Sequence, residues 1–207
     1  MKKAFLLIVA CTFAFVSAYA QTSAVEAVSQ LTKAEQFKAK NSFVKETTIY
    51  EDKQSGMKLY AKLFTDLNSG EQLTALEIWP TVGSKLLTGG YVSPLGYLDM
   101  DQIDDLLLAL ETILSEAKAA DQKQMSTITY TANGGIDVFF TNAISGSAFG
   151  GTPGVVVFRK KWYHLNEYGV QTISYSEATT DCSIKNLPKL IAAVKEAQTI
   201  AKQSLGK

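Results

Sequence analysis

Two residue types that bind anions and perform catalysis are almost missing from this 207-residue sequence, which has one arginine, Arg159, and one histidine, His164. Arginine reads phosphates and base edges through paired hydrogen bonds, so a chain with one arginine is poorly equipped to bind nucleic acid. The formal net charge is zero, with 20 basic and 20 acidic side chains. The sequence therefore disfavours nucleic acid as a partner, because nucleic acids attract basic proteins.

Apolar runs long enough to cross a membrane are also missing, and the most apolar stretch, residues 4–16, is short and follows two lysines. Small residues ending at Ala20 come next, and this order is typical of a secretory signal peptide. We expect cleavage after Ala20 and export of the protein to the periplasm or the extracellular space. Lipoprotein processing at Cys11 is the alternative, but it would leave only a short apolar core before that cysteine.

Removal of the signal peptide, residues 1–20, would leave Cys182 as the only cysteine, so no disulfide could form within the chain. Cys182, or a serine, could act with His164 as the nucleophile and base of a hydrolase. No third orienting residue and no catalytic motif accompanies them, so an enzyme is the alternative function and no catalytic residue is assigned. No cofactor is expected.

Acidic residues cluster at Asp99, Asp101, Asp104 and Asp105. Their spacing does not follow the calcium-binding loop pattern, because an isoleucine occupies a ligand position and a leucine replaces the bidentate glutamate. Carboxylates in the first turns of a helix stabilise it through the helix dipole. We therefore expect these aspartates to cap a helix and expect no metal site.

Alternating apolar and polar residues, bounded by turn signals, predict eight strands. The clearest turn is Asn133-Gly134-Gly135, which is typical of a β-hairpin. Residues 21–42 are polar and rich in alanine and predict a short N-terminal helix or a tether. The strands are expected near residues 44–50, 57–65, 72–79, 85–92, 125–132, 136–142, 155–163 and 170–176.

Two amphipathic helices are expected, over residues 97–120 and 187–204, because apolar side chains recur there at steps of three and four. In the first, Asp99 is predicted to cap the first turn, with Gln102 at the capping-box position. In the second, Asn186 is predicted to be the cap.

The order of elements suggests that the chain repeats itself at an offset of 84 residues. The sequence therefore predicts a single α+β domain over residues 43–207, made of two ββββα units, about 43–120 and 121–207. An antiparallel sheet would carry two helices on one face. At this offset Cys182 matches Leu98, which favours a small buried side chain over a reactive thiol. Other matched pairs are Ile103 with Leu187, Leu106 with Leu190, Leu107 with Ile191, Leu110 with Val194, Thr88 with Thr172, and Tyr91 with Tyr175.

One segment resembles small, uncharacterised exported bacterial proteins that share a Y-L-D-x-x-(E/Q)-I-D-x-L-L helix signature. The matching residues are Tyr97-Leu98-Asp99, Gln102-Ile103-Asp104 and Leu106-Leu107. The resemblance implies a shared fold. It implies no activity, so it assigns no functional residue. The ββββα repeat is also similar, at the level of fold alone, to duplicated folds that bind single-stranded nucleic acid.

Aromatic residues are well supplied on the predicted strands and at the tip of the glycine-rich loop 145–154. Aromatic rings on an exposed sheet face are suited to carbohydrate or small apolar ligands. We therefore expect an exported, non-enzymatic binding or interaction domain, whose partner is a protein or a small ligand on the sheet face opposite the helices. A homodimer is left open as an alternative, although nothing in the sequence indicates one. The candidate ligand-binding residues are Phe149, Trp162, Tyr163, Trp79 and Tyr60.

Overall fold

The structure is a computed structural model. The chain divides between Leu31 and Thr32, and both sheets and all the helices named below belong to the unit that begins at Thr32. The predicted signal peptide, the predicted strand near 85–92 and the loop 145–154 lie outside the described residues. The structure describes residues 31–80, 94–119, 127–141, 155–165 and 171–205.

The strands form two antiparallel four-stranded sheets, each in the order of the sequence. Sheet A contains β1 (Val44–Glu51), β2 (Lys58–Asp66), β3 (Gln72–Trp79) and β4 (Gly96–Asp99). Sheet B contains β5 (Thr127–Thr131), β6 (Ile136–Thr141), β7 (Val155–Leu165) and β8 (Gln171–Ser183). The helices are α2 (Lys33–Lys40), α4 (Ile103–Ala119) and α5 (Leu187–Ser204), with short 3-10 turns η1 (Met100–Gln102) and η2 (Asn133–Gly135).

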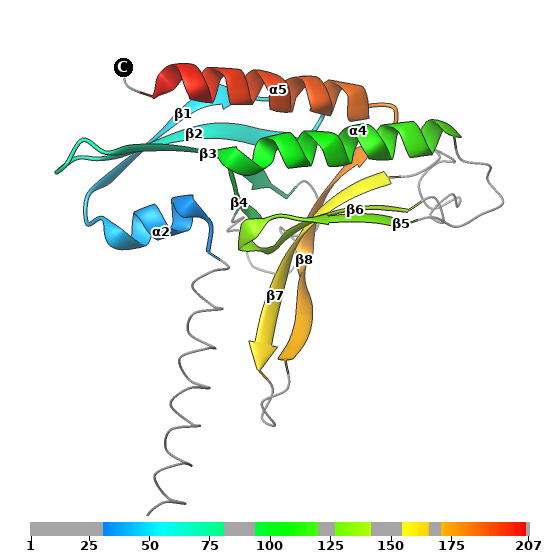
Figure 1. Ribbon diagram of the computed structural model, residues 1–207, viewed down its shortest axis with the longest axis horizontal. Helices are drawn as coiled ribbons and strands as arrows, with labels where there is room; N and C mark the ends of the chain where they lie inside the picture. The colour runs from blue at the N-terminus through cyan, green and yellow to red at the C-terminus, as the bar shows by residue number, and fades with distance from the viewer. Residues whose placement is uncertain (1–30, 81–93, 120–126, 142–154, 166–170, 206–207) are drawn as a thin grey trace, which may run out of the picture. The chain divides into compact units, whose positions relative to one another are not determined.

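The α+β fold of two ββββ units, each followed by a long helix, is confirmed. Helices α4 and α5 lie side by side above the strands (Figure 1) and are joined at their surfaces by hydrogen bonds from Lys195 to Glu111 and from Gln198 to Asp104. Each helix crosses to the other unit. Helix α5 follows sheet B in the sequence but contacts β1, β2 and β3, and α4 follows sheet A but contacts β5.

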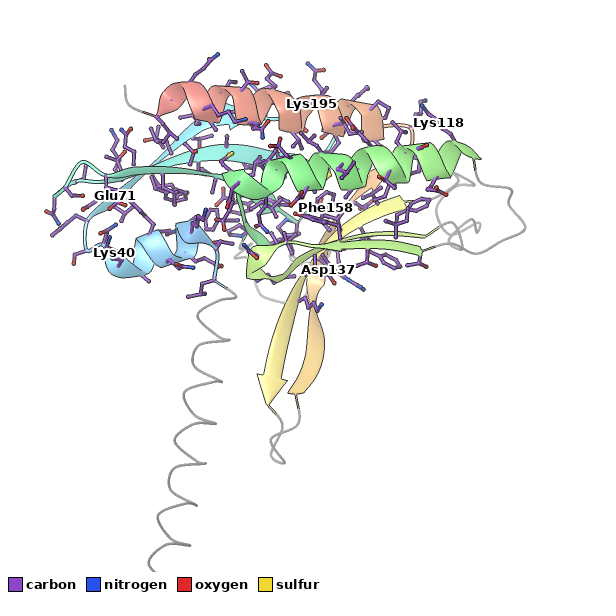
Figure 2. The ribbon with its side chains drawn as sticks, viewed as in Figure 1. Lys40, Glu71, Lys118, Asp137, Phe158 and Lys195 are labelled. Carbon is purple, nitrogen blue, oxygen red and sulfur yellow. The ribbon has the colours of Figure 1, made fainter. Side chains whose placement is uncertain are left out.

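One apolar core lies between this helical layer and the two sheets. Strands β2 and β3 contribute Leu59 and Leu76, and β7 contributes Phe158, which lies on the helix side of sheet B (Figure 2). Burial of apolar side chains from both units in one cluster explains why the two sheets form a single compact unit, since hydrophobic stabilisation grows with the buried area.

The repeat at 84 residues is visible in the element boundaries. Helices α4 and α5 begin at Ile103 and Leu187, and 187 minus 103 is 84. At the same offset β1, β3 and β4 overlap β5, β7 and β8, while β2 and β6 do not coincide because the connections on either side differ in length. Leu98 and Cys182, matched by the repeat, are both buried strand residues.

The start of the first long helix was predicted six residues too early. Tyr97, Leu98 and Asp99 belong to β4, η1 follows, and α4 begins only at Ile103. Asp99 makes no capping hydrogen bond to the turn after it. Its carboxylate is instead buried and accepts a hydrogen bond from the backbone N–H of Lys33, at the start of α2, at 2.8 Å.

The second long helix begins where it was predicted, at Leu187, with Asn186 at the cap position. The Asn186 side chain makes no capping hydrogen bond, so that part of the prediction is wrong. Strand β8 runs past the predicted end near residue 176 as far as Ser183. Among the described residues, no helix is long and apolar enough to cross a membrane.

A short N-terminal helix was one of two alternatives predicted for residues 21–42. Helix α2, Lys33–Lys40, is helical in the later part of that segment. Thr32 and Glu35 form a capping box, with the Thr32 hydroxyl accepting from the Glu35 N–H and the Glu35 carboxylate accepting from the Thr32 N–H. This Thr-x-x-Glu signal is readable in the sequence. The Asn133-Gly134-Gly135 turn lies beside it, and a Cβ at Gly134 would collide with the Thr32 side chain.

We predict that two leucines on α4 differ sharply in their contribution to stability. Replacing Leu110, which is fully buried, by alanine should lower the free energy of unfolding by about 2–5 kcal/mol. Leu108→Ala, at a side chain 65% exposed on the same helix, should change it by no more than about 0.5 kcal/mol. Urea denaturation measures both, and equal effects would contradict the packing described here.

Candidate functional site

The face of sheet A that points away from α5 carries the polar and aromatic side chains of β2, β3 and β4, and is called the outer face below. The strand register aligns Tyr60, Glu77 and Tyr97 in one row across the three strands. Lys62 lies in the next row, opposite Ala75. The alternation of strand side chains therefore places two of the predicted ligand-binding residues, Tyr60 and Trp79, on one surface.

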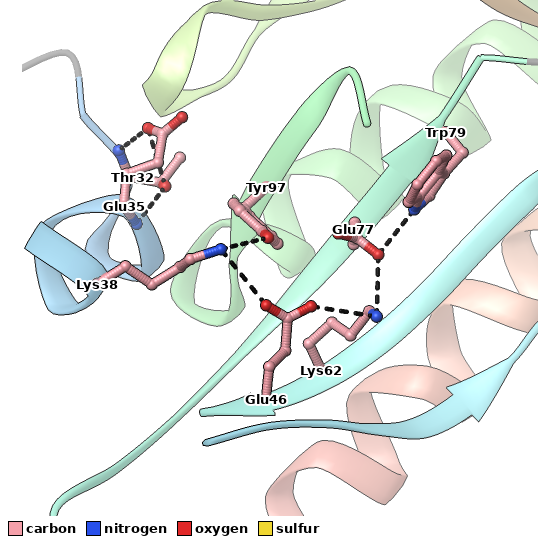
Figure 3. A network of polar contacts seen from close by, with 8 residues as sticks. All are labelled: Thr32, Glu35, Lys38, Glu46, Lys62, Glu77, Trp79 and Tyr97. Atoms are coloured by element: carbon pink, nitrogen blue, oxygen red, sulfur yellow. Dashed lines mark hydrogen bonds and ion pairs between the residues drawn. The ribbon is translucent and has the colours of Figure 1, made fainter. Parts of the chain in front are cut away.

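Glu77 is the centre of this surface. Its side chain is only 3% exposed, and its carboxylate accepts a hydrogen bond from the Trp79 indole Nε1 at 2.7 Å (Figure 3). The Lys62 ammonium lies 3.2 Å from the same carboxylate and is itself 14% exposed. A buried carboxylate must be paired to remain charged. Glu77 therefore determines the positions of the Lys62 ammonium and of the Trp79 indole.

The contacts continue along the sheet to α2 (Figure 3). Lys62 also lies 3.2 Å from the Glu46 carboxylate on β1. Glu46 in turn lies 3.4 Å from the ammonium of Lys38, on α2, which donates a hydrogen bond to the Tyr97 hydroxyl at 3.2 Å. An unbroken chain of polar contacts therefore joins α2 to Trp79 across three strands, β1, β2 and β3.

The two lysines of this network are held in the charged state. Partial burial alone would lower the pKa of Lys62, but its hydrogen bonds and charge interactions with Glu77 and Glu46 outweigh burial and raise that pKa. The pKa of Lys38 is raised in the same way, with Tyr97 and Glu46 opposing the effect of burial. Two cations and two carboxylates therefore balance one another on the outer face.

The Tyr60 ring lies beneath the cation of this network, with the Lys62 ammonium 5.6 Å from the ring centroid. Tyr60 and Trp79 are both half-buried. They occupy diagonal positions on neighbouring strands, which are usually about 7–8 Å apart. The outer face thus presents two aromatic side chains beside a carboxylate and an ammonium.

Sheet B carries a related cluster on the face away from the core. Asp137 is 1% exposed, accepts a hydrogen bond from the Thr131 hydroxyl at 2.6 Å and lies 3.8 Å from the Arg159 guanidinium. Arg159 is stacked 5.0 Å from the centroid of Phe139. The single arginine of the chain is therefore paired with Asp137. Asp137 and Phe158 lie on opposite faces of sheet B (Figure 2).

Of the five predicted ligand-binding residues, the structure describes the side chains of Tyr60 and Trp79. Tyr60 and Trp79 lie together on sheet A. Trp162 and Tyr163 belong to β7 of sheet B, where only their backbone positions are described. Phe149 lies outside the described residues.

Two surface hollows border the described residues, with volumes of about 390 and 230 Å³. The first lies at the end of α4, between Glu111 and Lys118. The second lies beside α2 and includes Asp99 and Leu205. Neither of these two hollows is lined by Tyr60, Glu77 or Trp79.

Cys182 and His164 are far apart in the strand register. Cys182 on β8 is opposite Val156 of β7, while His164 lies eight residues further along β7, roughly 26 Å at about 3.3 Å per residue. Cys182 is buried, and burial raises its pKa from 9.0 to about 12. The thiol is therefore protonated at neutral pH, which is unfavourable for a nucleophile.

The acidic cluster is occupied by contacts within the chain. Asp101 pairs with Lys33 at 2.7 Å, and Asp104 accepts a hydrogen bond from Gln198. Among the described residues, no group of three histidine, cysteine or acidic side chains has an arrangement that could hold a metal ion.

Sequence reasoning missed Lys62, Glu77, Glu46 and Lys38 as parts of the site. One signal was available, since Glu77 interrupts the apolar strand Leu73–Trp79, and a charged residue within such a run requires a buried partner. The approach of Lys38 could not be anticipated, because α2 reaches the sheet only through tertiary packing. Comparisons of the chain with protein-family models, with curated proteins and with solved structures give no match.

We predict that breaking the buried pair on the outer face is costly. Lys62→Met leaves the Glu77 carboxylate buried without its cation and should lower the free energy of unfolding by about 3–5 kcal/mol. Lys195→Met, which removes the exposed pair with Glu111, should cost less than about 1 kcal/mol. Replacing Lys62 and Glu77 together by apolar residues should recover much of the loss, and equal effects of the two single variants would refute the central role of Glu77.

We further predict that Cys182 reacts with iodoacetamide only after unfolding, because the thiolate is scarce and the side chain is buried. Mass spectrometry of native and denatured protein measures the labelling. Rapid labelling of the native protein would support the cysteine hydrolase.

Since folding raises the pKa of Cys182 from 9.0 to about 12, the stability that this thiol contributes is complete below pH 9 and declines as the pH rises toward 12.

Proposed function

We propose that this protein is an exported, non-enzymatic binding domain that holds a neutral carbohydrate on the outer face of sheet A. The observation that carries the proposal is the pair of half-buried aromatic side chains, Tyr60 and Trp79, fixed beside the buried Glu77 and Lys62. Export rests on the predicted signal peptide.

The chemistry of this surface suits a sugar. Aromatic faces provide apolar area for the C–H face of a pyranose ring. The Glu46 carboxylate, whose side chain is 31% exposed beside Lys62, provides charge-assisted hydrogen bonds to its hydroxyl groups. Trp79 is held by its hydrogen bond to Glu77, so little rotational freedom would be lost on binding. Rigid aromatic groups beside fixed polar groups favour recognition.

The charge balance of the surface favours a ligand without net charge. Lys38 and Lys62 are matched by Glu46 and Glu77, so an anionic ligand would find no uncompensated cation within this network, and the exposed Lys58 lies beside it, opposite Trp79. The two aromatic side chains are half-buried on neighbouring strands, and a sugar chain could contact both along the sheet.

The two tryptophans of the chain allow a direct test. Trp162→Phe leaves Trp79 as the only indole, and Trp79→Phe leaves Trp162. Titration with neutral oligosaccharides should change the tryptophan fluorescence of the Trp162→Phe protein and leave that of the Trp79→Phe protein unchanged.

Tyr60→Ala should weaken the same binding about tenfold, which corresponds to roughly 1.4 kcal/mol. The affinity should vary little with salt, because no net charge is exchanged. The proposal fails if neutral oligosaccharides do not bind, or if their binding survives Trp79→Phe.

A further inference from the structure

Helix α2 is attached to the outer face of sheet A by a packing cluster of its own. Phe37 and Ala34 of α2 are buried against Phe64, Ala75 and Tyr97, and these residues form a cluster separate from the main core. The Phe64 and Tyr97 rings meet edge to face at 5.5 Å. We call the surface formed by Phe64, Ala75 and Tyr97 the α2 cradle.

The α2 cradle recognises a helix at three points. Asp99 accepts a hydrogen bond from the N–H of Lys33, in the first turn of α2, where orphan donors and the helix dipole favour an anion. In the middle of the cradle, the Phe37 side chain packs in the apolar cluster with Phe64 and Tyr97. At the far end Lys38 contacts Tyr97 and Glu46. The cradle therefore fits a short helix with an apolar face and a basic last turn.

The connection between α2 and sheet A is short and imperfectly satisfied. Helix α2 ends at Lys40 and β1 begins at Val44, so three residues, 41–43, form the hinge. The side-chain Nδ2 of Asn41 is buried without a hydrogen-bond partner in the described part of the chain. Exchange of an element across a hinge between copies is a low-cost route to dimers.

A pair of exposed apolar side chains lies at the same hinge. Phe43 is 63% exposed and Leu67 is 62% exposed, and the Leu67 N–H donates to the Phe43 carbonyl at 2.9 Å. Exposed apolar side chains that occur together at one place mark interaction surfaces. An extended three-residue hinge reaches only about 10 Å, at roughly 3.4 Å per residue, so two exchanging copies would meet at these residues.

We propose that the α2 cradle accepts α2 from a second copy of this chain, so that two chains exchange these helices and form a symmetric dimer. Exchange keeps every contact of α2 with its cradle, opens the short hinge that holds the unpaired Asn41 Nδ2, and buries Phe43 and Leu67 between the copies. The partner's helix then supplies the lysine at the end of the polar network on each outer face.

Cross-linking distinguishes exchange from the closed monomer. Lys33 and Asp101 are both more than half exposed and lie in contact, so Lys33→Cys with Asp101→Cys creates a pair that a short bis-maleimide can join. Cys182 is buried and does not compete. In the exchanged dimer the link joins two chains, and a denaturing gel shows a dimer band that grows with protein concentration. Lys33→Cys alone is the control.

Surface variants test the contact at the hinge. Phe43→Ser with Leu67→Ser should raise the dissociation constant of the dimer at least tenfold in light scattering, while Leu108→Ser, at a leucine 65% exposed on α4, should leave it unchanged. A protein that is monomeric at every concentration overturns the proposal, and so does a dimer whose cross-links lie only within chains.

Discussion

The outer face of sheet A depends on one buried carboxylate. Glu77 lies in a central strand where apolar neighbours would leave a charge uncompensated, and the resulting need for partners positions the Lys62 ammonium and the Trp79 indole. Lys62 then engages Glu46, and Glu46 engages Lys38 of α2. The position of α2 and the presentation of the aromatic rings are thus linked to the same charge.

Periodicity predicted most of the fold, because alternating side chains and turn residues act locally. The hairpin at Asn133-Gly134-Gly135 and the start of α5 at Leu187 were placed correctly. The beginning of α4 was not, since Asp99 has the sequence signature of a cap but its carboxylate serves α2, 66 residues earlier. Whether a carboxylate caps its own helix or another depends on tertiary packing, which a local pattern does not contain.

The two units share a framework and differ on their outer faces. The repeat preserves buried positions such as Leu98 and Cys182, as the common core requires. On the exposed sides a lysine lies over Tyr60 in sheet A, while Arg159 lies over Phe139 in sheet B. Tyr60 and Trp79 could be predicted as candidates from their positions on strands, but their polar partners could not, because those come from four separate elements.

Within one chain, each long helix packs against the sheet of the other unit, and this arrangement has a consequence for biosynthesis. Helix α5, the last element of the chain, covers β1, β2 and β3, so the first sheet emerges from the ribosome long before the helix that completes its core. Strand pairing without that cover leaves apolar surface in water and is marginally stable. Folding of the first unit is therefore completed only after α5 has been synthesised.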